Sequence, residues 1–225
     1  MLISQFINLV LGTVIALLPI TNPFSTAALF LSITEGDSKE KRRQQAFKGC
    51  VYVLCILVSF LIAGRFIMEF FGISIPGLRI AGGLMVARIG FNMLKPPAEQ
   101  ARTEVSKSEA IEKDDISFTP LAMPSMSGPG AIAVTIGLAT QTKGVLDFTA
   151  IIIGIFIVTV ICWAVLRAST RVVDFLGKTG MNALSRIMGF LLLCVGVQFI
   201  VNGIIGIVTD PETLRKVFEA IQAVS

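Results

Sequence analysis

The sequence predicts an all-α polytopic membrane protein whose six transmembrane helices form two inverted three-helix repeats, with helices 1 and 4 broken at Pro/Gly motifs. Three observations predict this fold class. Hydrophobic residues make up 54% of the 225 residues and charged residues only 15%, whereas about 25% of a soluble domain is charged. Six apolar runs are long enough to cross a bilayer. Landmarks of the first three runs recur, in order, in the last three.

The six apolar runs define the predicted spans. About 20 apolar residues are needed to cross the hydrocarbon core of a bilayer as a helix. The first run is longer than this, because the 32 residues from Leu2 to Ile33 would extend about 48 Å as one straight helix. We therefore expect a break or a re-entrant geometry within it. The predicted spans are 6–33, 49–70, 75–94, 118–140, 146–166 and 185–208.

The distribution of basic residues predicts the orientation. The connections after the first, third and fifth runs, with their flanking residues, hold thirteen Lys and Arg residues, and the opposite side holds five. Basic connections stay in the cytoplasm. We therefore expect both termini in the periplasm, and loops 34–48, 95–117 and 167–184 in the cytoplasm.

Two segments outside the spans complete the domain organisation. Residues 95–117 contain a Pro-Pro pair and dense mixed charge with few apolar residues, which predicts a flexible charged cytoplasmic linker. It separates a first three-span repeat, 1–94, from a second, inverted one, 118–208. Residues 209–225 contain an Asp-Pro pair at Asp210 and Pro211, followed by apolar residues at helical spacing, which predicts a short amphipathic tail on the outer membrane surface.

Proline landmarks reveal the repeat. The stretch "LLPITNPFSTA" recurs as "AMPSMSGPGAIA", so that Pro19 lies 105 residues before Pro124 and Pro23 lies 106 before Pro129. Further landmarks follow at offsets of 106 and 107 residues. Each half has an odd number of spans, so the second half enters the membrane with the opposite orientation. Inverted repeats with helices interrupted at matching positions are typical of secondary transporters, whose substrate site lies between the repeats.

The two interruptions predict a binding site. Proline lacks an N–H group and glycine leaves helical geometry cheaply, so both breaks free backbone groups at a depth where they must face protein, a cavity or a ligand. Neutral donors and acceptors from both breaks suit a small polar or zwitterionic solute. The alternative is a pair of kinked helices whose small residues permit close packing without a ligand. The predicted substrate-binding residues are Thr21, Asn22, Pro23, Ser25, Thr26, Ser125, Ser127, Gly128, Pro129 and Gly130.

Two arginines occupy equivalent positions at the start of the third and sixth predicted spans. Arg79 and Arg186 are 107 residues apart. A cation at a helix start opposes the helix dipole, which points to a specific carboxylate or carbonyl partner and to a gating role. The alternative is interfacial anchoring, in which the side chain extends to the membrane surface. The role of Arg88, within the third span, is left open.

Several classes of site are disfavoured by composition. The chain contains no histidine, and its four cysteines lie inside apolar runs without CxxC spacing. We therefore expect no metal, no cofactor and no enzymatic activity. No carboxylate lies deep in a span, which leaves the coupling ion unassigned. The expected partners are the lipid bilayer and a small neutral solute, with no nucleic acid; a homo-oligomer is left open.

Four motifs closely resemble the MarC family of bacterial inner-membrane proteins. They are "ITNPFSTAALFL", "FGISIPGLRIAGG", "AMPSMSGPGAIA" and "SRIMGFLLLCVGVQFIVNGI", and the resemblance runs over residues 1–208. It implies six spans in the bacterial inner membrane, a distant kinship with LysE-type exporters, and transport of small neutral amino acids in some relatives.

The residues and the resemblance together favour a secondary transporter that moves small neutral solutes, with amino acids as the favoured class, by alternating access. The alternative is a non-transporting integral membrane protein that acts as a partner or assembly factor. Substrate identity, the direction of transport and the coupling ion are left open.

Overall fold

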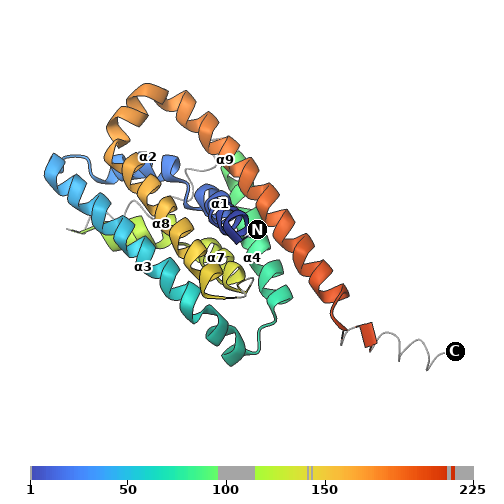
Figure 1. Ribbon diagram of the computed structural model, residues 1–225. Coiled ribbons are helices and arrows are strands. Elements are labelled where there is room, and N and C mark those ends of the chain that lie inside the picture. Colours follow the sequence, from blue (N-terminus) through green and yellow to red (C-terminus); the bar gives the residue numbers. More distant parts are fainter. Residues whose placement is uncertain (1, 96–114, 141, 143, 212–213, 216–225) are drawn as a thin grey trace.

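The protein is helical throughout the residues that its computed structural model describes, which are 2–95, 115–140, 142, 144–211 and 214–215 (Figure 1). This confirms the all-α class. Most of the expected linker and most of the expected C-terminal tail lie outside the described residues. The helices are α1 (Leu2–Thr21), α2 (Pro23–Ile33), α3 (Lys39–Phe71), α4 (Ile75–Leu94), η2 (Ser117–Met126), α7 (Pro129–Ala139), α8 (Val145–Arg167) and α9 (Ser169–Val208).

Four helical segments in the described part of the chain are long and apolar enough to cross a membrane, and a fifth is added if the bent pair of η2 and α7 counts as one span. The helix α4 has 20 residues, but it carries Arg79 and Arg88 and is not among them. The four segments are Ile3–Ile33, Lys39–Phe71, Val145–Arg167 and Thr179–Val208.

The connection expected as a loop at 167–184 is helical instead. The helix α9 begins at Ser169, sixteen residues before the predicted start of the last span, and its backbone departs from helical geometry at Gly177, with φ 60° and ψ 179°. In Figure 1 the chain arches over after α8 and then continues into the long straight part of α9. Charged residues made this stretch look like a loop, but charge alone does not stop a helix. A positive φ is cheap only for glycine, so the chain turns there.

Glycines bring α4 and α9 into backbone contact. A β-carbon added at Gly83 would lie 2.6 Å from the carbonyl oxygen of Gly196, and one added at Gly90 would lie 2.6 Å from the carbonyl oxygen of Gly189. Small residues allow such close approach between membrane helices. The two helices therefore pack along a seam made of Gly83, Gly90, Gly189 and Gly196, which we call the glycine seam.

Two further glycines set the packing of α3 and α8. A β-carbon at Gly49 in α3 would lie 2.6 Å from Leu121 Cδ2 in η2, and one at Gly154 in α8 would lie 2.6 Å from Thr13 Cβ in α1. Helix α3 thus packs on η2, and α8 packs on α1. The buried side chains Val53, Leu57, Ile151, Ile155 and Val158 lie in the core along α3 and α8.

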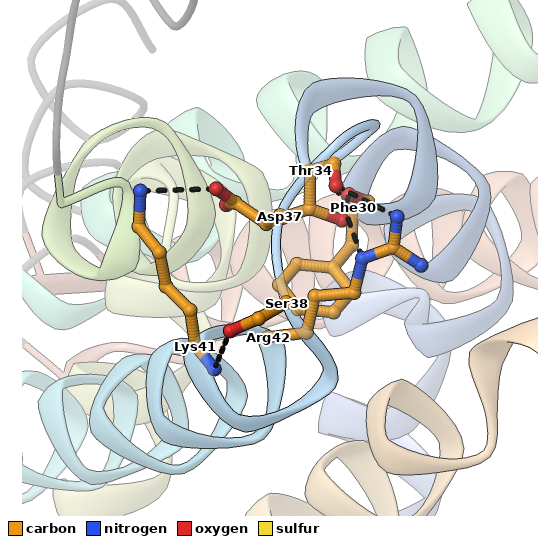
Figure 2. A network of polar contacts seen from close by, with 6 residues as sticks. All are labelled: Phe30, Thr34, Asp37, Ser38, Lys41 and Arg42. Carbon is orange, nitrogen blue, oxygen red and sulfur yellow. Dashed lines mark hydrogen bonds and ion pairs between the residues drawn. The ribbon is translucent and has the colours of Figure 1, made fainter.

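A polar network fixes the corner between α2 and α3 (Figure 2). Arg42 donates to the Thr34 carbonyl oxygen from Nε at 3.0 Å and from Nη2 at 2.8 Å. Lys41 pairs with Asp37 at 3.0 Å, and Ser38 caps α3 by accepting from the Lys41 N–H. A cation on the last carbonyls of a helix satisfies them and complements the helix dipole. The end of α2 is therefore tied to the start of α3.

The glycine seam leads to a prediction about stability. In Gly196→Ala, the new methyl group would lie 2.5 Å from the Ala87 backbone nitrogen, which cannot give way as a side chain can. We expect a loss of about 1–3 kcal/mol of unfolding free energy, measured by thermal unfolding in detergent. Gly12→Ala is the control, because nothing lies within 4 Å of that position. Equal stability of the two variants would contradict the close packing of α4 on α9.

The corner network leads to a second prediction. Arg42→Ala leaves the Thr34 carbonyl without its charged donor, and a hydrogen bond to a charged group contributes about 1.5–3 kcal/mol. We expect a lower thermal unfolding temperature than for Lys39→Ala, which removes an exposed charge from the first residue of the same helix. If both variants unfold at the same temperature, the network does not hold the corner.

Candidate functional site

The first break lies at Asn22, between α1 and α2. Asn22 has φ 36° and ψ 67°, a left-handed conformation that asparagine tolerates better than most residues. Its Oδ1 accepts from the Ser25 N–H at 3.3 Å, and its Nδ2 donates to Ser25 Oγ at 2.8 Å. Pro23 occupies the first position of α2, where a missing N–H costs nothing. The sequence thus ends one helix and begins the next within two residues.

The second break lies between η2 and α7, which are bent by 64°. Within η2, Thr119 and Met123 are extended, because a following proline pushes a residue out of the helical region. Ser127 closes the end of η2, since its N–H and its Oγ both donate to the Ala122 carbonyl, at 2.9 and 2.8 Å. Gly128 then precedes Pro129, the first residue of α7.

The two breaks are neighbours in the fold. Helix α1 contacts both η2 and α7, and α2 contacts η2. A β-carbon added at Gly130 would lie 3.3 Å from Val86 Cγ2 in α4 and 3.9 Å from Ile20 Cγ2, just before the first break. Each break is therefore packed beside the other and beside α4.

Polar contacts tie the first break to α4 and α9. The Asn22 Nδ2 lies 3.6 Å from the sulfur of Met93, and the hydroxyls of Ser25 and Ser185 share a hydrogen bond of 2.8 Å. Met93 and Ser185 were not predicted from sequence. Met93 offered no signal, whereas Ser185 directly precedes Arg186 in the repeated motif and could have been noticed there.

A third contact links the first break to α8. The thiol of Cys162 lies 3.6 Å from Thr21 Oγ1, and Thr21 Oγ1 donates in turn to the Leu18 carbonyl at 3.1 Å. Thr26 Oγ1 donates to the Thr21 carbonyl at 3.4 Å. The sequence suggested only that Cys162 is a small apolar residue, and its hydrogen bond depends on packing between distant segments.

The predicted site residues differ in exposure, and this separates structural from accessible groups. Thr21, Thr26 and Ser127 are buried and bonded within the protein, and Asn22 is only 8% exposed. Three of the predicted residues are half-buried, and Pro129 is exposed. The half-buried groups, which retain accessible surface for a solute, are Ser25, Ser125 and Gly128.

The arginines predicted to gate lie in different settings. Arg79 is half-buried in the first turns of α4. Arg186 is exposed and lies in the part of α9 that follows the break at Gly177. In the described part of the chain no ion pair joins either arginine to a carboxylate. Their gating role stays a prediction. Arg88 is exposed.

A cavity of about 260 Å³ lies at the end of α3, near the turn into α4. A cation and an anion, Arg65 and Glu69, stand one turn apart on its α3 wall, and the hydroxyl residues Ser74 and Thr140 belong to the other walls. The remaining lining residues are Met68, Gly72, Ile73 and Ile75. Across the described segments, His, Cys, Asp and Glu side chains form no cluster of three that could hold a metal ion.

At the start of η2, Asp115 has a lowered pKa. Ser117 lowers the pKa of this carboxyl, since its N–H donates to Asp115 Oδ1 at 2.9 Å, and Lys48 Nζ at 3.4 Å adds to the effect. A depressed pKa means that the contact stabilises the fold above the ordinary pKa of aspartate and that this contribution is lost as the pH falls through the lowered value. The contact joins η2 to α3.

Comparisons with known proteins agree with the membrane character of the fold. The chain matches the model of the MarC family of integral membrane proteins over residues 7–208. It is 45% identical over 209 residues to the inner membrane protein MarC of an Escherichia coli O1:K1 strain, covering 88% of this chain and 94% of the relative. The protein of the same name from Citrobacter koseri is 46% identical over 209 residues, which again cover 88% of this chain and 94% of the relative. No solved structure matches the chain.

The geometry of the first break leads to a third prediction. Asn22→Ala removes the cap and keeps a β-carbon at positive φ, whereas Asn22→Gly removes both the cap and the β-carbon. The left-handed conformation costs about 1–2 kcal/mol for an ordinary residue, so we expect the alanine variant to unfold at a lower temperature than the glycine variant. Thermal unfolding in detergent measures the difference. If the two variants are equally stable, the left-handed conformation at this break would be disproved.

Proposed function

Because the chain belongs to the MarC family of integral membrane proteins, we propose that it is a secondary transporter that carries a small neutral solute across the bacterial inner membrane by alternating access. An amino acid is the favoured class of solute. The termini face the periplasm in this proposal, as the basic connections predict. The observation that carries the proposal is the packing of two broken helices, one from each half of the chain, beside each other.

The backbone explains why two adjacent breaks suit a transporter. Pro19 and Pro23 cannot donate to the carbonyls of Ile15 and Pro19, which therefore lose their usual intrahelical donors. Inside a membrane such groups are tolerated where they face protein or line a cavity. In transporters the interrupted helices of two repeats supply free backbone groups to a solute near the midplane. The accessible donors and acceptors at Ser25, Ser125 and Gly128 are suited to this use.

The glycine seam supports the inverted repeat. Gly83 and Gly189 are 106 residues apart, as are Gly90 and Gly196. If a two-fold axis relates the halves, a contact between Gly83 and Gly196 requires a second contact between Gly189 and Gly90. Both contacts are present. The same packing along α9 supports α4 as the third span of the first half, despite its two arginines.

The packing of α3 and α8 is consistent with the same two-fold relation between the halves. Gly49 and Gly154 are 105 residues apart, and so are Pro19 and Pro124. Gly49 packs on η2, the element that contains Pro124, and Gly154 packs on α1, the element that contains Pro19. Each half therefore places its second helix on the first helix of the other half. This interlocked arrangement supports two equivalent halves that surround one shared site.

The cavity at the end of α3 favours a zwitterionic solute. Arg65 can bind a carboxylate through its planar fork of N–H groups, and Glu69 can accept from an ammonium group. An amino acid carries both groups at neutral pH and has no net charge. We propose that this cavity is an entry site on the periplasmic side. It lies at the C-terminal end of α3, and the basic first connection lies at the other end of that helix.

Flux measurements test the proposal. Protein reconstituted into liposomes is expected to exchange radiolabelled alanine, serine, threonine or valine across the bilayer. Ser25→Ala removes an accessible hydroxyl at the first break and is expected to lower the flux about two- to tenfold, since one hydrogen bond contributes about 0.5–1.5 kcal/mol. Ser32→Ala, at the far end of α2, is the matched control.

Size-exclusion chromatography and circular dichroism verify that each variant is folded. Absence of flux for all four amino acids in folded wild-type protein would contradict the proposed substrate class. Equal flux in Ser25→Ala and Ser32→Ala would remove the first break from the site.

A further inference from the structure

A groove of about 230 Å³ runs between α3 and α8, on the outside of the bundle. Apart from the Thr159 hydroxyl, which donates to the Phe156 carbonyl at 2.8 Å, its walls offer mainly hydrocarbon, aromatic and thiol groups. Its lining includes Phe47 and Val51 of α3 and Phe156 and Trp163 of α8.

Both walls of the groove lead to an arginine at the same end. The helices α3 and α8 run in opposite directions (Figure 1), so Phe47 and Trp163 lie at one end of the groove. Arg43 is four residues before Phe47, and Arg167 is four residues after Trp163. Residues four apart lie on the same face of a helix. Two cations therefore continue the two apolar walls beyond this end.

The arginines are placed to receive an anion. The guanidinium of Arg167 lies over the Trp163 ring, 5.2 Å from its centroid, and this stacking holds it at the mouth of the groove. Arg43 and Arg167 are both exposed. Within the described residues neither forms an ion pair with a carboxylate. Their planar N–H forks match the geometry of phosphate oxygens.

We propose that this groove binds one anionic phospholipid, with an acyl chain between α3 and α8 and its phosphate between Arg43 and Arg167. Basic pockets between membrane helices at the cytoplasmic side recognise such headgroups, and this is the end that the basic connections place there. Tryptophan at the mouth fits the headgroup level of a bilayer. The inference is independent of the proposed transport function.

The phosphate contributes more to selectivity than the acyl chain does. An acyl chain that enters the groove moves out of the bilayer interior, which is as apolar as the groove. Its transfer therefore contributes little to the free energy of binding. The phosphate, in contrast, gains charge-assisted hydrogen bonds from two guanidinium groups. Binding should therefore depend on the headgroup charge, and it should be weaker for a zwitterionic lipid, whose own ammonium group neutralises the phosphate.

Native mass spectrometry of the purified, delipidated full chain tests the proposal. We titrate it with phosphatidylglycerol and with phosphatidylethanolamine of the same acyl chains. One molecule of phosphatidylglycerol should bind more tightly than phosphatidylethanolamine does. The double variant Arg43→Gln/Arg167→Gln should weaken phosphatidylglycerol binding about tenfold or more. Arg65→Gln/Arg88→Gln is the matched control, because it removes the same charge from exposed positions outside the groove.

A second variant tests the apolar part of the site. Val51→Trp fills the groove and leaves both arginines, and it should also weaken phosphatidylglycerol binding. Equal binding of the two lipids, or equal loss in the two double variants, would overturn the proposal. So would stabilisation by inorganic phosphate as large as that by the lipid, or a dimer that excludes lipid from the groove.

Discussion

The structure depends on one constraint, which is that backbone N–H and C=O groups inside a membrane must be paired without help from bulk water. A chain of continuous helices meets this constraint without further arrangement. Two interruptions, at Asn22 and between η2 and α7, lie in the described part of the first and fourth apolar runs. A side chain at each interruption satisfies a backbone group that the break leaves free. Asn22 accepts from the first turn of α2, and Ser127 donates to the last turn of η2. Helices α4, α8 and α9 contact the first of these ends through Met93, Cys162 and Ser185.

Close backbone packing follows from the same requirement. Lipid tails are as apolar as leucine, so helices in a bilayer are held together by van der Waals contact and by interhelical polar contacts. The glycine seam brings α4 and α9 into backbone contact, Gly49 brings α3 close to η2, and Gly154 brings α8 close to α1. These four contacts leave the break region enclosed by helices from both halves of the chain. The polar contacts to Met93, Cys162 and Ser185 then fix the first break within that enclosure.

Much of the fold can be predicted from the sequence because it depends on local residue chemistry. The apolar runs, the breaks at Asn22 and Gly128 and the recurring landmarks depend on residue type and spacing alone. The early start of α9 was missed, since the charged residues of 169–184 resemble a loop although the helix tolerates them at its surface. The irregularity of η2 was also missed, although Pro120 and Pro124 both act on the residues before them. The partners of the first break come from α4, α8 and α9, and no local pattern predicts which distant side chain packing will bring there.

The corner shown in Figure 2 has a consequence for motion. Arg42 donates to the Thr34 carbonyl, Asp37 pairs with Lys41, and Ser38 caps the next helix, so polar contacts join the end of α2 to the beginning of α3. The backbone leaves helical geometry next at Asn22, at the other end of α2. A rearrangement at the first break would therefore turn α2 and α3 together, and a local change of two dihedral angles would reach the full length of a 33-residue helix.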